Sequence, residues 1–409
     1  MEISSKEWYK RREKMAASKA TVLRALLKNP QILKVKPSLL VFLSRYMGKF
    51  KIQNIGGNLI LHSHLPPLNS HAYKRFINEQ LLGKSDGPSH AQVGLTNACP
   101  QKCAYCYNRD RTGTPMNKEA ILQLSRDLEK MGVFWLGWTG GEPLLNKDIV
   151  EITEKAARGC AVKLFTTGCT LTPQRARDLT KAGLFSVSVS LDHWQEDIHD
   201  RSRGCPGAYA TALRAIDIFR NVDGLHVGVS AVLSKDVIKT GRTEEFLEFL
   251  KGLGIHEAWL SEAKPSVQDY WHDDLVITEE ERLSLVRLQD RYNRNDGMTV
   301  NYLAHFEGRE HFGCNAGRKM VYVDAFGEVS PCVFTPLTFG NIQEAPVQDI
   351  FKRMRRHFPS DCRCYINHNY KLLRKYSRGH LPVREEDYHE MAKEVRFDSL
   401  AKFFELYYR

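Results

Sequence analysis

The sequence predicts an α/β protein built on one parallel sheet, and three observations support this. Between about residues 90 and 295, short runs rich in β-branched residues alternate with amphipathic stretches of helical period. The loops that join them are short, as expected where helices connect successive parallel strands. The chain has 409 residues, 42% of them hydrophobic, which is enough for one large core and appendages. These patterns leave open whether the sheet curves into a barrel or stays open.

The repeat can be followed element by element. We expect strands at Gln92–Thr96, Val133–Trp138, Val162–Thr166, Phe185–Ser190, His226–Val232 and His256–Ser261. Between them we expect helices at Lys118–Met131, Lys147–Arg158, Pro173–Ala182, Ala208–Asn221 and Thr243–Leu253.

Positive charge is concentrated ahead of this region. Residues 1–51 hold thirteen Lys or Arg and three Glu, a local charge of +10 in a chain whose net charge is +11. They predict two amphipathic helices, Lys14–Lys28 and Pro37–Met47, which Pro30 and Pro37 separate. A basic arm of this kind suits an anionic membrane surface, an acidic leader peptide or a nucleic acid. It also suits a helical cap under the sheet whose basic face is solvated.

The next segment links the arm to the sheet. Lys49–His62 alternates apolar and polar residues around Gly56 and Gly57, which predicts a β-hairpin. The phrase LPPLNSHAYKRF then leads into a connecting helix.

Cys99, Cys103 and Cys106 stand in the spacing C-x3-C-x2-C after the first expected strand. Four thiolates would close a cubane iron–sulfur cluster, so three leave one iron with an open coordination site. The alternatives are a structural zinc site or scattered buried thiols. Zinc sites usually pair one C-x2-C with another, which this segment does not offer.

The second expected strand ends in Gly140, Gly141, Glu142 and Pro143. The two glycines permit a close approach between the backbone and a ligand, and the carboxylate can hold an ammonium group.

These two motifs resemble those of the radical S-adenosylmethionine (SAM) superfamily, in which Tyr105 would occupy the aromatic position of the cysteine motif. The resemblance implies a [4Fe–4S] cluster on Cys99, Cys103 and Cys106, with SAM chelating the open iron. Reductive cleavage of SAM would give a 5′-deoxyadenosyl radical that removes a hydrogen atom from the substrate. The resemblance selects a partial (β/α)6 barrel of TIM type. A scaffold that merely holds clusters is disfavoured, because both motifs are intact.

Further SAM contacts follow from the same resemblance. It assigns SAM-binding roles to Tyr105, Gly140, Gly141, Glu142, Pro143, Thr166, Ser190, Asp192 and Arg203, and no catalytic residue beyond the cluster and SAM. An arginine suits the carboxylate of SAM because its guanidinium binds bidentately. Thr167 departs from the family pattern, and Cys160, Cys169 and Cys205 receive no role.

A second cysteine set follows the barrel region. Met320–Val323 and Val329–Phe334 predict a hairpin turning at Gly327, followed by a helix at Val347–His357. Cysteines lie around it at Cys314, Cys332, Cys362 and Cys364. The region resembles SPASM and twitch extensions, which implies one auxiliary iron–sulfur cluster on these four cysteines. The C-x-C ending departs from the commoner C-x2-C, so a zinc site or an incomplete cluster stays open as an alternative.

The predicted organisation has four parts. They are a basic helical arm with a hairpin (1–90), the radical SAM barrel (91–300), a SPASM or twitch-like domain (301–370) and a helical tail (371–409). The ten cysteines do not form a secreted disulfide pattern, and there is no signal peptide. No apolar run approaches the roughly 20 residues that span a bilayer. We therefore expect a cytoplasmic enzyme, reduced by a flavodoxin or ferredoxin-type partner, with no nucleic-acid partner.

Two hypotheses address the substrate. The basic arm favours a membrane lipid, with peripheral docking at the inner face of an anionic membrane. The alternative is a peptide or protein maturase, because SPASM and twitch enzymes often act on polypeptides. Leader-binding modules usually contain a three-stranded sheet, whereas one hairpin is predicted before residue 90, so the sequence leans toward a lipid.

Overall fold

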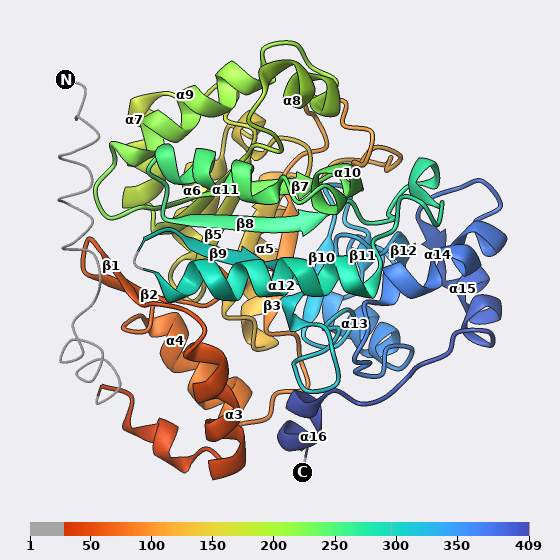
Figure 1. Cartoon of the computed structure of the whole chain (residues 1–409). Helices are drawn as coiled ribbons and strands as arrows, with labels where there is room; N and C mark the ends of the chain where they lie inside the picture. The colour runs from red at the N-terminus through yellow and green to blue at the C-terminus, as the bar shows by residue number, and fades with distance from the viewer. Residues whose placement is uncertain (1–27, 296, 409) are drawn as a thin grey trace.

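The computed structural model describes residues 28–295 and 297–408. Its centre is a nine-stranded sheet with the order β11-β10-β3-β4-β5-β6-β7-β8-β9 (Figure 1). The strands are β3 (His90–Gly94), β4 (Trp135–Thr139), β5 (Ala161–Thr166), β6 (Leu184–Ser190), β7 (His226–Leu233), β8 (Glu257–Glu262), β9 (Thr299–Tyr302), β10 (Met320–Val323) and β11 (Val329–Ser330). Neighbours from β10 to β9 are parallel, and β11 is antiparallel to β10.

The α/β prediction is confirmed, and the six expected strands lie within two residues of those observed. The sheet is open, since within the described ranges its edge strands β9 and β11 do not pair with each other. A seventh parallel strand, β9, and the helix α12 (Glu279–Arg294) before it were not predicted. The start of α12 carries a capping box, in which Thr278 and Glu281 bond each other's backbone N–H groups.

Helices connect successive barrel strands. They are α5 (Lys118–Lys130), α6 (Ile149–Ala156), α7 (Pro173–Lys181), α8 (Glu196–Arg203), α9 (Ala208–Arg220), α10 (Lys235–Lys239), α11 (Thr243–Gly252) and α12. The five helices expected in this region are all present, with ends shifted by at most two residues.

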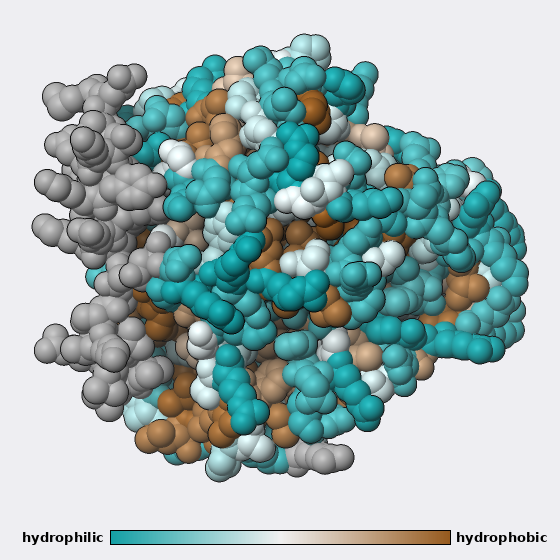
Figure 2. All heavy atoms as spheres, viewed as in Figure 1, coloured by the Kyte–Doolittle hydropathy of each residue, from teal (hydrophilic) through white to brown (hydrophobic). Residues whose placement is uncertain are grey.

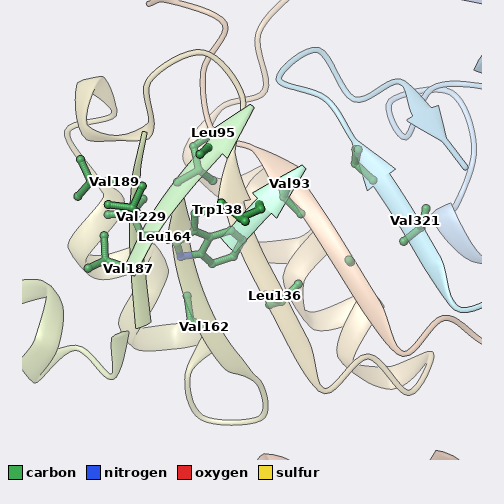
Figure 3. Close-up of a cluster of buried hydrophobic side chains, with 14 of the residues drawn as sticks. Val93, Leu95, Leu136, Trp138, Val162, Leu164, Val187, Val189, Val229 and Val321 are labelled. Carbon is green, nitrogen blue, oxygen red and sulfur yellow. The ribbon is translucent and has the colours of Figure 1, made fainter. Parts of the chain in front are cut away.

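Hydrophobic side chains of several neighbouring strands gather in one buried cluster (Figure 3). On β6, Val187 and Val189 are buried in the main hydrophobic core, as are Leu136 and Trp138 on β4. Because side chains alternate along a strand, Ser186, Ser188 and Ser190 face the opposite side. The same alternation puts Trp135, Lys163 and Trp259 on this inner side, so the interior of the partial barrel carries serines together with aromatic and charged groups.

N-terminal elements cover the amino ends of these strands. They are η1 (Pro30–Lys34), α3 (Pro37–Met47), the hairpin β1 (Gln53–Ile55) and β2 (Asn58–Ile60), α4 (His71–Arg75) and η2 (Phe76–Leu82). The predictions of α3 and of the hairpin are confirmed, while the expected helix Lys14–Lys28 lies outside the described residues except for its last residue. Gly56 turns the hairpin at φ +56, where an added Cβ would come within 2.4 Å of Gly224 Cα.

Polar contacts fix this segment under the barrel. Ser63 donates its backbone N–H to Glu257 on β8 at 2.7 Å and accepts from Lys163 Nζ on β5 at 2.6 Å. Gln53 donates to Thr299 Oγ1 of β9 at 2.9 Å. The N-terminal segment thereby connects β5, in the middle of the sheet, with β8 and β9 at one end of it.

The C-terminal part adds α13 (Val347–Arg355), α14 (Tyr365–Tyr376), α15 (Glu385–Ala392), α16 (Lys402–Tyr408) and the short pair β12 (Leu337–Thr338) and β13 (Val383–Arg384). The predicted hairpin is present, but its second strand ends at Ser330 rather than at Phe334. Because β10 pairs with β3, the hairpin extends the barrel sheet instead of standing apart from it. Helix α16 packs against α3, so the two ends of the described chain share one hydrophobic cluster (Figure 1).

One buried ion pair joins the hairpin to the cysteine loop. Arg111 Nη1 lies 2.9 Å from Asp324 Oδ2, with side chains 3% and 2% exposed, and Arg111 Nη2 donates to Ser330 Oγ at 3.0 Å. Removing one partner of a buried pair leaves the other charge uncompensated.

We predict that Arg111→Met lowers the free energy of unfolding by about 3–5 kcal/mol, because Asp324 would be left buried without its cation. Denaturant titration of the cluster-free chain measures this. The control Arg158→Met removes an exposed pair with Glu154 at 3.9 Å and should change stability by less than about 1 kcal/mol. Equal effects of the two substitutions would contradict the assigned role.

Candidate active site and auxiliary cysteine site

The first cysteine triplet lies in the loop that follows β3. Two turns shape this loop, through bonds from Cys106 N to Cys103 O and from Arg109 N to Cys106 O, both 3.2 Å. Burial raises the pKa of the Cys99 thiol to about 12, and Glu142, Cys103 and Cys106 contribute to this rise. The three thiols therefore lie close enough to interact, and in the metal-free chain they hold protons that a bound metal must displace.

The Gly140–Pro143 segment packs directly on the cysteine loop. Gly141 N donates to Thr96 O at 2.6 Å, and Glu142 N donates to Ala98 O at 2.8 Å. A Cβ at Gly140 or Gly141 would come within 2.4 Å or 2.3 Å of a carbonyl oxygen of the cysteine loop. The glycines were predicted to permit close approach to a ligand; in the structure they permit close approach to the cysteine loop.

The Glu142 carboxylate lies at the centre of this arrangement and is fully buried. It accepts hydrogen bonds from Thr166 Oγ1, from both the N–H and the hydroxyl of Thr167, and from Leu144 N. Burial raises the pKa of this carboxyl, and the bonds from Thr166 and Thr167 oppose that rise. Thr167 departs from the family pattern, but it helps to hold the Glu142 carboxylate in place through two hydrogen bonds. Contacts of Glu142 and Thr166 with SAM stay predictions.

A second network connects the triplet to β6 and α8. Arg203 Nη2 lies 2.8 Å from Asp192 Oδ1, and Arg203 Nη1 donates to Cys103 Sγ at 3.8 Å. Tyr105 donates its hydroxyl to the other Asp192 oxygen. The structure brings these four predicted residues together, whereas the side chain of Ser190, two residues before Asp192, takes no part in this network.

The cysteine triplet and Arg203 fit an iron–sulfur cluster that binds a ligand with a carboxylate group. Arg203 Nε is buried and has no hydrogen-bond partner among the described residues, so this guanidinium can still receive a carboxylate. Two thiolates on one zinc ion at about 2.3 Å each stand at most about 4.6 Å apart. Within the described ranges, His357, Glu385 and His389 gather their ligand atoms within 4.8 Å, and no set of three cysteines does. The three thiols are therefore not gathered closely enough, as they lie in this structure, to hold one zinc ion together.

Three of the four C-terminal cysteines also share one location. Cys314, Cys332 and Cys364 line a common cavity, and the pKa of the Cys314 thiol is raised to about 12 by burial, with Cys332 contributing. Cys362 does not line this cavity; its sulfur accepts from Ser399 Oγ at 3.4 Å.

Of the remaining cysteines, Cys160 is buried and bonds Val133 O, Cys205 contacts Pro206 O, and Cys169 is half-buried after the third strand.

Charged residues that the sequence did not single out lie beside the second set. Lys264, which is buried just beyond β8, forms an ion pair with the buried Glu262 and another with the partly buried Glu307, the latter at 3.4 Å. Its ammonium also donates to Cys364 Sγ at 3.6 Å. Nothing local in the sequence marks these residues, because Lys264 and Cys364 meet only through the fold.

Aromatic side chains fill the space between the two cysteine sets. Tyr107, next to Cys106, places its ring 5.7 Å from Tyr322 and 6.1 Å from Phe334, two residues after Cys332. Its hydroxyl lies 2.6 Å from Thr139 Oγ1 at the end of β4. The two sets are therefore joined through packed side chains.

A cavity of about 790 Å³ extends from the second set to the N-terminal elements, and we call it the apolar chamber. Its wall is mostly apolar and includes Leu40 and Leu43 of α3, Phe312, Phe334 and Phe403. Two buried polar atoms on this wall, Gln92 Oε1 and His64 Nδ1, have no partner among the described residues. The His64 ring lies between the rings of Trp135 and Trp259, at 5.2 and 5.3 Å.

Hydrophobic side chains also reach the surface near the chamber. Leu33 of η1 is 80% exposed and Val41 of α3 is 49% exposed. Figure 2 shows such side chains gathered at the lower left, over η1 and α3. Within the described residues, no helix has the length and apolar character needed to cross a membrane.

Comparison with known proteins identifies the class. Residues 93–238 match the model of the radical SAM superfamily, and residues 314–371 match that of the SPASM iron–sulfur cluster-binding domain. The chain is therefore a radical SAM enzyme with a C-terminal SPASM domain, and its cofactors are SAM and iron–sulfur clusters.

Individual relatives differ in what they are named for. The AdoMet-dependent heme synthase of Methanosarcina barkeri is 24% identical over 66% of this chain and 84% of its own. The PqqA peptide cyclase of Granulibacter bethesdensis is 23% identical over 63% of this chain and 72% of its own. Streptococcus suis SuiB, solved with its precursor peptide SuiA, shares the fold with a TM-score of 0.55 and 15% identity, over 75% of this chain and 79% of SuiB.

We predict that replacing Cys99, Cys103 and Cys106 together by alanine abolishes 5′-deoxyadenosine formation from SAM. The iron bound at the C-terminal set should remain, so iron per chain should fall to about half of the wild-type value. Anaerobic reconstitution with iron analysis and chromatography of the nucleoside measures both. Undiminished 5′-deoxyadenosine would show that the triplet does not hold the SAM-cleaving cluster.

Proposed function

We propose that this enzyme removes a hydrogen atom from a polypeptide substrate. When bound, the cluster and SAM supply a 5′-deoxyadenosyl radical. The sequence similarity to a peptide cyclase along most of both chains supports this substrate class, and the SuiB complex shows that a fold of this type accommodates a precursor peptide. A flavodoxin or ferredoxin-type protein would deliver the electron.

The chain's own residues define the place of reaction. The cysteine loop, the Gly140–Pro143 segment and the Asp192–Arg203 pair converge at the carboxyl ends of β3 to β6, the end of such barrels that carries active sites. Arg203 would orient the carboxylate of SAM. The aromatic group of Tyr107, Tyr322 and Phe334 excludes water between this place and the second cysteine set.

A second candidate substrate is a lipid with a long hydrocarbon chain, and one observation favours it. Every residue of an extended peptide carries an N–H and a C=O that need partners when buried. The wall of the apolar chamber is mostly apolar and presents few such partners, whereas a hydrocarbon chain needs none. The exposed Leu33 and Val41, with Lys34 and Lys36 beside them, would place the chamber near an anionic membrane surface.

One assay separates the candidates. The reconstituted enzyme is incubated anaerobically with SAM and dithionite, and with either the peptide fraction or the lipid extract of the source cells. Mass spectrometry should reveal a mass change in a peptide if the main proposal holds. A mass change confined to a lipid would replace it with the second candidate, and no change in either fraction would overturn both.

The chamber provides an independent check. Leu43→Trp puts a large side chain into the chamber, whereas Val41→Trp adds the same side chain on the exposed side of α3. If a hydrocarbon chain enters the chamber, Leu43→Trp should lower lipid product formation about tenfold or more and spare 5′-deoxyadenosine formed without substrate. Val41→Trp should match the wild type when the lipid is presented in detergent. Equal lipid turnover in both variants would argue against the chamber as the lipid site.

A further inference from the structure

The fold separates Cys362 from the other three C-terminal cysteines. Cys362 is 5% exposed and belongs to the hydrophobic cluster formed by α3 and α16, not to the wall of the apolar chamber. Its backbone is held on both sides, since its N–H donates to Ser399 O at 3.0 Å and its carbonyl accepts from Gly308 N at 2.8 Å. Its thiol accepts from Ser399 Oγ. Cys362 is thus held in this hydrophobic cluster, away from the wall that the other three cysteines line.

The carboxylate of Glu307 lies where a fourth ligand would be needed. It lines the apolar chamber together with Cys314, Cys332 and Cys364. It interacts electrostatically with the thiols of Cys314 and Cys364. Lys264 Nζ contacts both Glu307 Oε1, at 3.4 Å, and Cys364 Sγ, at 3.6 Å. Each protein ligand of a cubane binds a different iron, so the ligand atoms need not touch one another. A Glu307 carboxylate and a Cys364 thiol that are bridged by one ammonium suit such a cluster.

The Glu307 carboxylate has few hydrogen-bond donors around it. Among the described residues, the one hydrogen bond to its side chain is the long contact from Lys264. The same ammonium is held by Glu262, which also accepts from Tyr302 at 2.9 Å and from Asn367 at 3.3 Å.

The other nearby cation is also engaged. Arg282 directs Nε and Nη2 to Glu279, at 2.7 and 2.6 Å. One buried ammonium therefore faces two carboxylates, and the partly buried Glu307 has the longer of the two contacts. A carboxylate removed from water is costly unless a cation or metal receives it.

We propose that the auxiliary cluster is held by the thiolates of Cys314, Cys332 and Cys364 and by the carboxylate of Glu307, and that Cys362 is not a ligand. A hard carboxylate ligand would exchange more readily than the soft thiolates, and Glu307 lines the apolar chamber. The proposal goes beyond the substrate assignment and does not depend on it.

The test uses the full chain with Cys99, Cys103 and Cys106 replaced by alanine, so that the auxiliary cluster is observed alone. Adding Cys362→Ala should leave about four irons per chain, whereas adding Cys314→Ala or Cys364→Ala should remove most of them. Loss of the iron in the Cys362→Ala variant, with the far-ultraviolet circular dichroism unchanged, would overturn the exclusion of Cys362.

Electron paramagnetic resonance of the reduced cluster tests Glu307. Glu307→Ala should keep the iron but change the g values, and the spectrum should then shift on addition of cyanide, which would occupy the iron left without a protein ligand. Glu307→Cys should give a thiolate-ligated spectrum that cyanide does not shift. The control Glu310→Ala, an exposed glutamate three residues later, should match the parent.

An unchanged spectrum in Glu307→Ala, indifferent to cyanide, would overturn the assignment of Glu307. If the alanine variant does not fold, Glu307→Gln preserves the side-chain shape and is judged by the same two criteria.

Discussion

The contact between the cysteine loop and the Gly140–Pro143 segment is the constraint on which the active site depends. The two loops follow neighbouring strands, β3 and β4, and their backbones pair so closely that neither Gly140 nor Gly141 leaves room for a Cβ. Glu142 extends the contact to β5 by accepting bonds from Thr166 and Thr167. Since a buried carboxylate with four donors is strongly fixed, three strand ends form one rigid platform under the cysteine triplet.

The rest of the molecule is arranged around that platform. The hairpin β10–β11 joins the sheet beside β3, and the buried Arg111–Asp324 pair ties it to the cysteine loop. The ring of Tyr107, next to Cys106, contacts the ring of Phe334, two residues after Cys332, so the cysteine loop packs against the segment that follows β11. The N-terminal helices and α16 then enclose the apolar chamber against the second cysteine set. The two cysteine sets are in this way held at a fixed separation, with an apolar space next to the second set.

Much of the fold could be predicted because buried parallel strands carry continuous β-branched runs, as in Val162–Thr166 and His226–Val232. Helix α12 was missed because its sequence, EEERLSLVRLQDRYNR, is dominated by charged residues, although Thr278 and Glu281 marked its start. The pairing of β10 with β3 was missed because residues about 230 positions apart leave no local signal. The same applies to the site: motif spacing identified Cys99, Cys103 and Cys106, whereas Glu307 and Lys264 reach the second set only through the fold. The resemblance to SPASM and twitch domains grouped Cys362 with Cys314, Cys332 and Cys364, whereas in the structure Cys362 packs in the hydrophobic cluster with α3 and α16.

Electron paramagnetic resonance of the anaerobically reduced wild-type enzyme, recorded with and without SAM, tests the central claim most directly. Two [4Fe–4S] signals are expected, because the triplet and the C-terminal set each hold a cluster. SAM should shift one signal and leave the other unchanged, because only the cluster expected on the cysteine triplet has an iron without a protein ligand. A single signal, or two signals that both ignore SAM, would contradict the account.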